Sequence, residues 1–262
     1  MKTISVIIPA YMEAKNIKAA VQNTAWALSE ARVDDYEILI IDCLKRDGTH
    51  DGTPEIAESL AKENSRIKVF HNSYINLGTK YWMGVDRAKF NYVVLVAGHN
   101  KLSRETLRDM LYHLGEADIL TSYAVNTEIR PLVRRVVSWL FTFLINFSTG
   151  LTLRYYNGAC IHKTDVVKQI KERNTSFAYM AELLAQLIKK GYSYKEIPFT
   201  LQKKEGGKSS AFKWGNLVSV IRTMFVLFWK YRISWAGRGV VRDGRDDRRD
   251  RHVFIVLQRI RG

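Results

Sequence analysis

The stretch Ile38–Thr49 reads Ile-Leu-Ile-Ile-Asp-Cys-Leu-Lys-Arg-Asp-Gly-Thr and gives the clearest single indication of the fold. Its four leading apolar residues form a short continuous run, which is typical of a strand buried on both faces of a sheet. The run stops at Asp42, and Asp47-Gly48-Thr49 has the composition of a turn before a helix. Open α/β sheets bind ligands at the carboxyl ends of their strands, so Asp42 is a candidate binding residue. A plain strand end is the alternative, because Asp and Gly close many strands.

The segments around this stretch repeat the same alternation of strand and helix. We expect strands at 4–8, 37–41, 67–71, 91–97 and 118–121, and helices at 14–30, 53–63, 78–88 and 103–114. Further along, a helix is expected at 177–190 and an edge strand at 193–201. Such alternation predicts an α/β fold with a doubly wound, mostly parallel sheet.

Composition narrows the class of protein. The chain has 262 residues, 47% of them hydrophobic, which is enough for one large domain with additions. The net charge of +15 indicates an anionic partner such as a phosphorylated substrate, a lipid surface or a nucleic acid. Cys43 and Cys160 are too few for a disulfide framework, and the first strand begins too soon for a signal peptide, so a cytoplasmic location is expected. No nucleic-acid reader motif or concentrated basic helix is present, and we rank nucleic-acid binding last.

Four motifs in order resemble one known family. They are the opening strand at 4–8, the Pro-x-Tyr-x-Glu loop at 9–13, the Asp-x-x-x-x-Asp-Gly-Thr stretch at Asp42–Thr49, and Asn76-x-Gly78 at a helix start with Gly84 and Ala88 behind it. Together they resemble the family 2 glycosyltransferases of the GT-A fold, over roughly residues 3–212, and the dolichyl-phosphate-sugar-synthase-like branch fits the later segments best. The resemblance implies a domain at 1–212, a nucleoside-diphosphate-sugar donor and inversion at the anomeric carbon.

The resemblance also implies which residues hold the donor. Tyr11 would cover the base, and the carboxylates of Glu13 and Asp42 would accept hydrogen bonds from the ribose or the base. Lys80, in the first turn of a helix, would meet phosphate. The full set of expected nucleotide-sugar-binding residues is Pro9, Tyr11, Glu13, Asp42, Gly78, Lys80, Gly98, His99 and Asn100. Read without the family, Tyr11 is a loop aromatic, Glu13 a first-turn carboxylate and Lys80 a surface lysine.

The sequence departs from the family at Ala97-Gly98-His99-Asn100-Lys101. The family usually has Asp-x-Asp there, which holds a divalent cation, Mn²⁺ or Mg²⁺, on the two phosphates. Ala97 has no ligand atom, and the imidazole of His99 suits Mn²⁺ better than Mg²⁺. Three readings stay open: His99 as a metal ligand, His99 as a direct phosphate donor with Lys101 replacing the metal charge, and loss of catalysis.

On the acceptor side, Arg130, Arg134 and Arg135 precede an uncharged stretch at 136–153, expected to be a buried or interfacial helix. Arg154 replaces a family Asp in the acceptor-side loop, where a basic residue could meet a phosphate. Glu182 matches a family carboxylate that faces the acceptor as base or positioning group; its alternative is a solvated helix carboxylate. The phosphate or acceptor loop is expected to use Lys204, Lys208 and Ser209.

The chain is therefore identified as a family 2 glycosyltransferase, with a polyprenyl phosphate, or another lipid-linked or glycan molecule, as the expected acceptor. Residues 213–235 read as an amphipathic helix suited to a membrane interface, with packing on the core as the equal alternative, and residues 236–262 as a flexible charged tail. This implies peripheral association with the inner face of the cell membrane. The rival interpretation is a catalytically impaired relative that binds a nucleotide-sugar or a protein partner without turnover.

Overall fold

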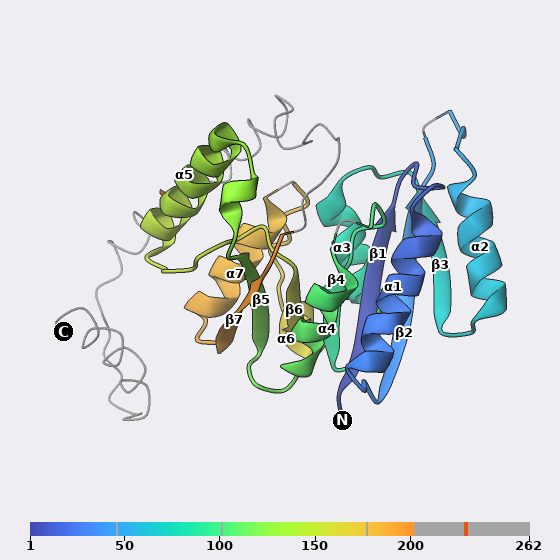
Figure 1. Ribbon diagram of the computed structural model, residues 1–262, viewed down its shortest axis with the longest axis horizontal. Helices are drawn as coiled ribbons and strands as arrows, with labels where there is room; N and C mark the ends of the chain where they lie inside the picture. The colour runs from blue at the N-terminus through green and yellow to red at the C-terminus, as the bar shows by residue number, and fades with distance from the viewer. Residues whose placement is uncertain (46, 101, 177, 202–227, 230–262) are drawn as a thin grey trace.

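A computed structural model describes residues 1–45, 47–100, 102–176, 178–201 and 228–229. Within these residues one mixed sheet has the strand order β3-β2-β1-β4-β6-β5-β7. The strands are β1 (Thr3–Ala10), β2 (Asp35–Cys43), β3 (Ile67–Asn72), β4 (Tyr92–Leu95), β5 (Ile119–Ala124), β6 (Cys160–Lys163) and β7 (Tyr194–Phe199). The helices are α1 (Ile17–Glu30), α2 (Thr53–Glu63), α3 (Leu77–Arg87), α4 (Arg104–Tyr112), α5 (Leu132–Thr149), α6 (Thr164–Lys168) and α7 (Tyr179–Lys189), with a 3₁₀ turn η1 (Thr127–Ile129) (Figure 1).

The expected doubly wound, mostly parallel sheet is confirmed. β1 pairs in parallel with β2 and β4, and β2 with β3. β6 is antiparallel to both β4 and β5, whereas β5 and β7 are parallel. Because β6 is antiparallel to both β4 and β5, β5 runs in the same direction as β1, β2 and β4. The carboxyl ends of these four strands therefore share one edge of the sheet.

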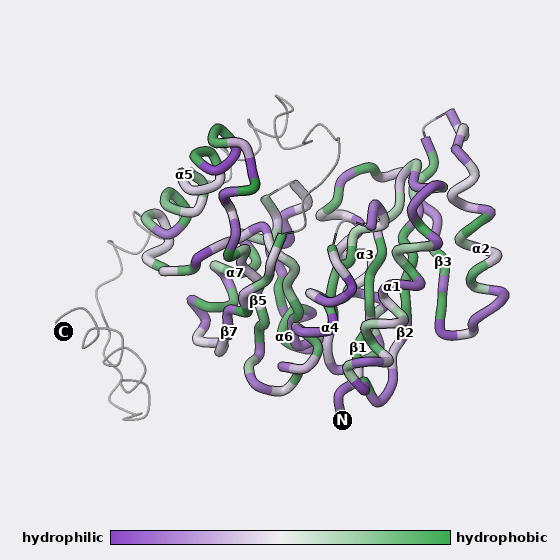
Figure 2. Tube along the Cα trace, in the orientation of Figure 1, coloured by the Kyte–Doolittle hydropathy of each residue, from purple (hydrophilic) through white to green (hydrophobic). Residues whose placement is uncertain are grey.

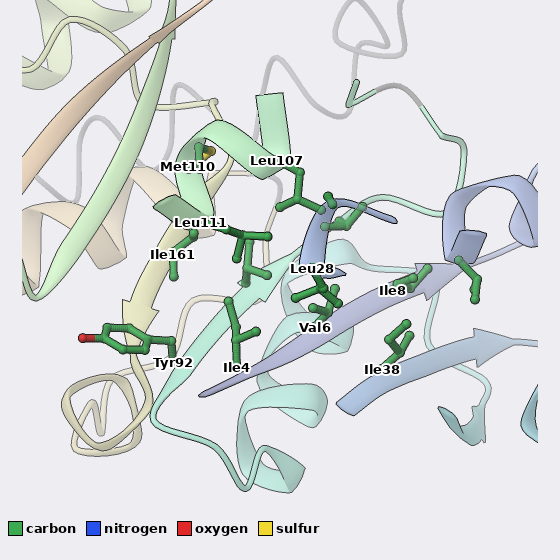
Figure 3. Close-up of a cluster of buried hydrophobic side chains, with 14 of the residues drawn as sticks. Ile4, Val6, Ile8, Leu28, Ile38, Tyr92, Leu107, Met110, Leu111 and Ile161 are labelled. Atoms are coloured by element: carbon green, nitrogen blue, oxygen red, sulfur yellow. The ribbon is translucent and has the colours of Figure 1, made fainter. Parts of the chain in front are cut away.

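Two apolar layers cover the faces of the sheet. Alternate residues of β1 point in opposite directions: Ile4, Val6 and Ile8 pack with α1, α2 and α4, as Figure 3 shows for Leu28 and Met110. Ile7 faces the second layer, which α3, α6 and α7 supply. A strand buried on both faces favours apolar side chains at successive positions, as residues 6–8 of β1 and 38–41 of β2 show.

β1 continues two residues past its expected end at Ile8, and Pro9 lies inside it. The Pro9 carbonyl accepts a hydrogen bond from Gly98 N at 3.2 Å, on the side of β4, which has already ended at Leu95. The N–H that proline lacks would face the same side, beyond the last β1–β4 register pair, Ile7 with Leu95, so the proline lies where the regular pairing of these strands has ended.

α5 begins four residues before the uncharged stretch and ends four residues earlier than that stretch does. Gly150 terminates the helix with a φ of +67°, a backbone conformation that favours glycine. Among the described residues no helix is both long and apolar enough to cross a membrane. The helix expected at 213–235, apart from Phe228 and Trp229, and the tail at 236–262 lie outside the described residues.

Candidate active site

The shared sheet edge brings the expected donor residues together. Ala10 and Asp42 are register partners at the ends of β1 and β2, and the 97–100 loop follows β4 beside them. Tyr11 and Glu13 lie in the loop that leaves β1. The crevice outside the carboxyl ends of the strands is the ligand site of open α/β sheets, and the expected cluster occupies it.

Asp42 is the most deeply buried carboxylate of this cluster, with 1% of its surface exposed. Its Oδ2 lies 3.1 Å from Nδ1 of His71, the neighbouring position on β3. Its Oδ1 is buried and has no hydrogen-bond partner among the described residues. An unpaired buried carboxylate oxygen costs about 1–3 kcal/mol or more, so this atom is suited to accept a donor from a bound ligand.

Lys80 extends from the first turn of α3 into the protein, and only 2% of its surface is exposed. Its Nζ donates to the carbonyl of Ala10 at 2.6 Å and lies 5.6 Å from the centre of the Tyr11 ring. Burial lowers the pKa of this amine, and the negative charges of Asp42 and Glu13 oppose that shift. The reading of Lys80 as an ordinary surface lysine is therefore wrong, and its role toward phosphate stays a prediction.

Short polar contacts fix the loops around Asp42. Glu13 donates its backbone N–H to Thr53 Oγ1 at 2.8 Å, and its Oε2 accepts from Asn16 Nδ2 at 2.8 Å. In the Asp-Gly-Thr turn, Asp47 Oδ1 accepts from both N and Oγ1 of Thr49. These two hydrogen bonds lower the pKa of Asp47 and tie the turn together.

Two glycines permit close backbone contacts at the site. A Cβ at Gly98 would lie 2.8 Å from the Pro9 carbonyl oxygen, and one at Gly78 would lie 2.6 Å from the backbone of Thr175. The first contact seats the 97–100 loop on β1, and the second places the start of α3 against the loop before α7. Asn100, at a φ of +52°, is held by a 3.0 Å hydrogen bond from Asn23 Nδ2.

Glu182 is 8% exposed in the first turn of α7, which excludes the solvated-carboxylate alternative. Asn174 Nδ2 donates to its Oε2 at 2.7 Å, and Gln186 Nε2 donates to its Oε1 at 3.3 Å. Two amides thus hold the carboxylate in one orientation, and its part in catalysis stays a prediction. Lys101, Lys204, Lys208 and Ser209 lie outside the described residues.

A second site lies at the same sheet edge, beyond β5. It is a cavity of about 240 Å³ lined by Tyr123, Ala124, Thr127, Arg130, Arg135, Ser138, Trp139, Thr142, Arg154 and Tyr155. Arg154 donates to the Tyr123 hydroxyl, and the Arg130 guanidinium lies 5.8 Å from the centre of the Tyr155 ring. Three arginines and no carboxylate are among the described residues that line this cavity, so its described lining is positively charged. The sequence groups Arg130 with Arg135 before the uncharged stretch, and it does not predict that Arg154 lies in one cavity with them.

α5 forms the outer wall of this cavity and exposes its other side to solvent. Its exposed apolar residues are Leu132, Val133, Val136, Val137, Trp139, Leu140, Phe143 and Phe147. The rings of Trp139, Phe143 and Phe147 stack in succession. The Phe228 ring continues the row, with its centre 6.4 Å from the centre of the Phe147 ring. Figure 2 shows this apolar helix at the margin of the fold, away from the sheet. We call this row of side chains the α5 apolar face.

Residues 5–169 match the model of glycosyl transferase family 2, which covers more than half of the chain. The chain belongs to glycosyl transferase family 2. The branch within this family expected from the sequence, the dolichyl-phosphate-sugar-synthase-like one, is not decided by this match.

Characterised and named relatives within the family share parts of the chain. A cholesterol galactosyltransferase of Borreliella burgdorferi is 30% identical over 115 residues, 44% of this chain and 30% of that protein. The glycosyltransferase AglD of Haloferax volcanii is 40% identical over 70 residues, 26% of this chain and 11% of that protein. These alignments span less than a third of either relative.

Solved structures confirm the GT-A-like fold of this family 2 chain. The glucosyl-3-phosphoglycerate synthase of Mycobacterium tuberculosis in complex with UDP has a TM-score of 0.62 at 14% identity, over 88% of this chain and 80% of that one. The same enzyme with Mn²⁺, UDP-glucose and phosphoglyceric acid has a TM-score of 0.61 over similar shares, 88% and 79%. Identity this low shows a common fold alone.

The residues at the 97–100 loop do not fit a carboxylate-held cation. Ala97 offers no ligand, Asn100 Oδ1 accepts from Asn23, and no group of three His, Cys, Asp or Glu side chains among the described residues could hold a metal ion. Mg²⁺ and Mn²⁺ prefer carboxylate oxygens, so the protein does not supply an Asp-x-Asp-type site here. His99 as a single metal ligand stays a prediction.

Proposed function

We propose that this protein transfers a sugar from a nucleoside-diphosphate sugar to a lipid phosphate, with a polyprenyl phosphate as the acceptor, at the cytoplasmic face of a membrane. One observation carries the proposal: the arginine-lined cavity opens at the same sheet edge as Asp42 and lies under the α5 apolar face. A lipid phosphate has an anionic head and an apolar chain, and these two surfaces offer matching partners side by side.

The donor half of the proposal rests on the cluster at the ends of β1, β2 and β4. Oδ1 of Asp42 would accept a hydrogen bond from the base or ribose, and Tyr11 would cover the base. The buried ammonium of Lys80 places a positive charge between Tyr11 and Asp42. This charge favours an anionic ligand, because a charge inside the protein is screened less than one at the surface.

In the reaction, an oxygen of the acceptor phosphate attacks the anomeric carbon, and the bond from that carbon to the nucleoside diphosphate breaks with inversion. A phosphate monoester has a second pKa near 6 and is largely ionised at neutral pH, so it needs no general base. Glu182, clamped by Asn174 and Gln186, would then position neighbouring groups instead of accepting a proton. Arg130, Arg135 and Arg154 would hold the phosphate, since guanidinium groups match phosphate oxygens in pairs.

The test compares undecaprenyl phosphate with undecaprenol, the same chain without phosphate, using UDP- and GDP-sugars. We expect transfer to the phosphate only. In Arg135→Gln the KM for undecaprenyl phosphate should rise about tenfold, because one charge-assisted hydrogen bond is lost. Arg134→Gln is the matched control, since Arg134 is the exposed neighbour on α5 that does not line the cavity.

Several results would contradict the proposal. Equal transfer to undecaprenol, or equal effects of Arg135→Gln and Arg134→Gln, would remove the phosphate role of the cavity. Transfer to a soluble glycan alone would support glycosyltransferase activity but contradict a lipid phosphate as the acceptor. Nucleotide binding without turnover on any acceptor would instead favour the catalytically impaired relative.

A further inference from the structure

His71 connects the buried carboxylate of Asp42 with Glu58 at the surface. It is the last but one residue of β3 and the register partner of Asp42 on β2. Its Nδ1 lies 3.1 Å from Asp42 Oδ2, and its Nε2 lies 3.0 Å from Glu58 Oε1 on α2. The imidazole therefore bridges two carboxylates, one fully buried and one 48% exposed.

We infer that His71, held by Glu58, is a positioning residue that keeps the Asp42 carboxylate oriented for the nucleotide and makes nucleotide affinity depend on pH. The inference rests on the proposed donor role of Asp42. With Oδ2 occupied by the ring, Oδ1 is the oxygen that remains for the ligand, and it is the buried atom without a partner among the described residues. Rotation of the carboxylate would break the contact to His71, so the bridge fixes where Oδ1 points.

The protonation state of His71 decides whether the bridge is complete. An imidazolium donates from both ring nitrogens, whereas a neutral ring donates from one and presents a lone pair at the other. That lone pair would face a carboxylate oxygen and repel it. The charged groups that face the ring among the described residues are Asp42 of β2 and Glu58 of α2.

The environment of the ring favours the imidazolium. Burial opposes the charge, but the hydrogen bonds to Glu58 and Asp42 outweigh burial, and the pKa of His71 is raised above its ordinary value near 6.5. The bridge is complete below this raised pKa and is lost as pH rises through it. Affinity for nucleotide should therefore be highest at mildly acidic to neutral pH and fall toward alkaline pH.

The experiment titrates the whole protein with UDP and with GDP calorimetrically between pH 6 and pH 9. In His71→Ala we expect the dissociation constant at pH 6.5 to rise about tenfold and its pH dependence to flatten. His71→Asn, whose amide nitrogen takes the place of Nδ1 beside Asp42 and cannot titrate, should recover part of the affinity with a flat profile. Glu58→Gln should shift the wild-type fall in affinity to lower pH, because the ring loses one of the carboxylates that raise its pKa.

A steady-state measurement separates positioning from catalysis: KM for the donor should rise in His71→Ala while kcat changes little. His113→Asn is the matched control. It removes another imidazole that contacts a carboxylate, Glu116 at 2.9 Å, but lies between α4 and β5 at the opposite edge of the sheet.

The outcomes distinguish the two claims. If the wild type binds UDP or GDP and the His71 variants share its affinity and pH profile, the inference is overturned while the proposed function stands. If the wild type binds neither nucleotide, the proposed donor class fails. Titration of the His71 ring by NMR in wild type and Glu58→Gln then tests the bridge itself, and an identical pKa in both would overturn it.

Discussion

The two sides of the sheet edge differ in how deeply their charged side chains are buried. On the side of β1, β2 and β4, the polar groups of Asp42 and Lys80 are buried and held by neighbouring atoms, with Oδ1 of Asp42 left unpaired. Beyond β5, the arginines of the cavity lie near the surface beside an exposed apolar helix. A buried, prearranged site favours one small ligand with fixed hydrogen-bonding groups, whereas an open basic and apolar surface suits a long amphipathic molecule.

The two halves of the sheet also differ in which neighbouring groups position their polar side chains. In the β1–β4 half, each polar group is positioned by parallel strands whose register is set by two apolar layers. In the β5–β7 half, the arginines of the cavity come from the end of η1, from α5 and from the 154–155 loop. Their positions depend on ring contacts: the guanidinium carbon of Arg154, for example, lies 4.6 Å from the centre of the Tyr123 ring. Substitutions should therefore have larger effects in the first half.

The largest effect is expected at Asp42. Asp42→Asn keeps the shape of the side chain but removes the negative charge that faces both the ligand and His71, and affinity for nucleotide should fall roughly 30-fold to 100-fold. Calorimetric titration with UDP and GDP measures this loss. Asp35→Asn, at the exposed start of the same strand and beside Arg66, should leave affinity unchanged. Equal affinity in Asp42→Asn and wild type would mean that the two halves do not differ as described.

The second-largest effect is expected on stability at β6, the strand that lies between β4 and β5 and connects the two halves of the sheet. His162 on β6 is fully buried, with its Nδ1 3.3 Å from the Tyr81 hydroxyl. Burial lowers the pKa of His162 to about 3. The unfolded chain takes up this proton near pH 6.5, so stability is complete above that pH and is lost as pH falls, by about 2 kcal/mol at pH 5.

His162→Gln removes this titration, and the amide can still hydrogen-bond with Tyr81. Urea unfolding between pH 7.5 and pH 5 should therefore show a smaller loss of the free energy of unfolding in the variant than in the wild type. His113→Asn, which changes a partly exposed imidazole, should keep the wild-type slope. If the free energy of unfolding falls equally with pH in His162→Gln and in the wild type, protonation of the buried imidazole does not cause the loss of stability.

The same contrast between halves governs what the sequence could predict. The β1–β4 half was predicted closely because a strand buried on both faces must be apolar throughout: α2 was placed at Thr53–Glu63, as observed, and β3 within one residue. The donor residues follow these strands directly, so placing the strands also gathers Tyr11, Asp42 and Gly98. The family resemblance names these residues as a group, and the strand ends explain why they lie together.

The arginine-lined cavity could not be predicted in this way. Arg130, Arg135 and Arg154 belong to separate elements with no common spacing, and only the antiparallel turn of β6 brings the 154–155 loop beside β5. The exposure of α5 was equally undetermined, since an uncharged helix can be covered by protein or by lipid. The bridge from Asp42 to His71 depends on the β2–β3 register, which the sequence does not state.

The smallest effect is expected on the α5 apolar face, where each ring contributes a part of a broad contact. Phe143 is 49% exposed and stacks between Trp139 and Phe147, so Phe143→Ser should leave the melting temperature nearly unchanged. Binding to phosphatidylglycerol vesicles, measured by co-sedimentation, should weaken about threefold to tenfold because less apolar area enters the interface.

Tyr112→Ser, an exposed aromatic on α4, is the control and should bind like the wild type. Vesicles of phosphatidylcholine should bind more weakly than anionic ones, because the net charge of +15 attracts negative headgroups. Equal binding of Phe143→Ser and wild type, or no binding of the wild type to either vesicle, would show that the α5 apolar face does not contact lipid and would leave the cavity to a soluble phosphorylated acceptor.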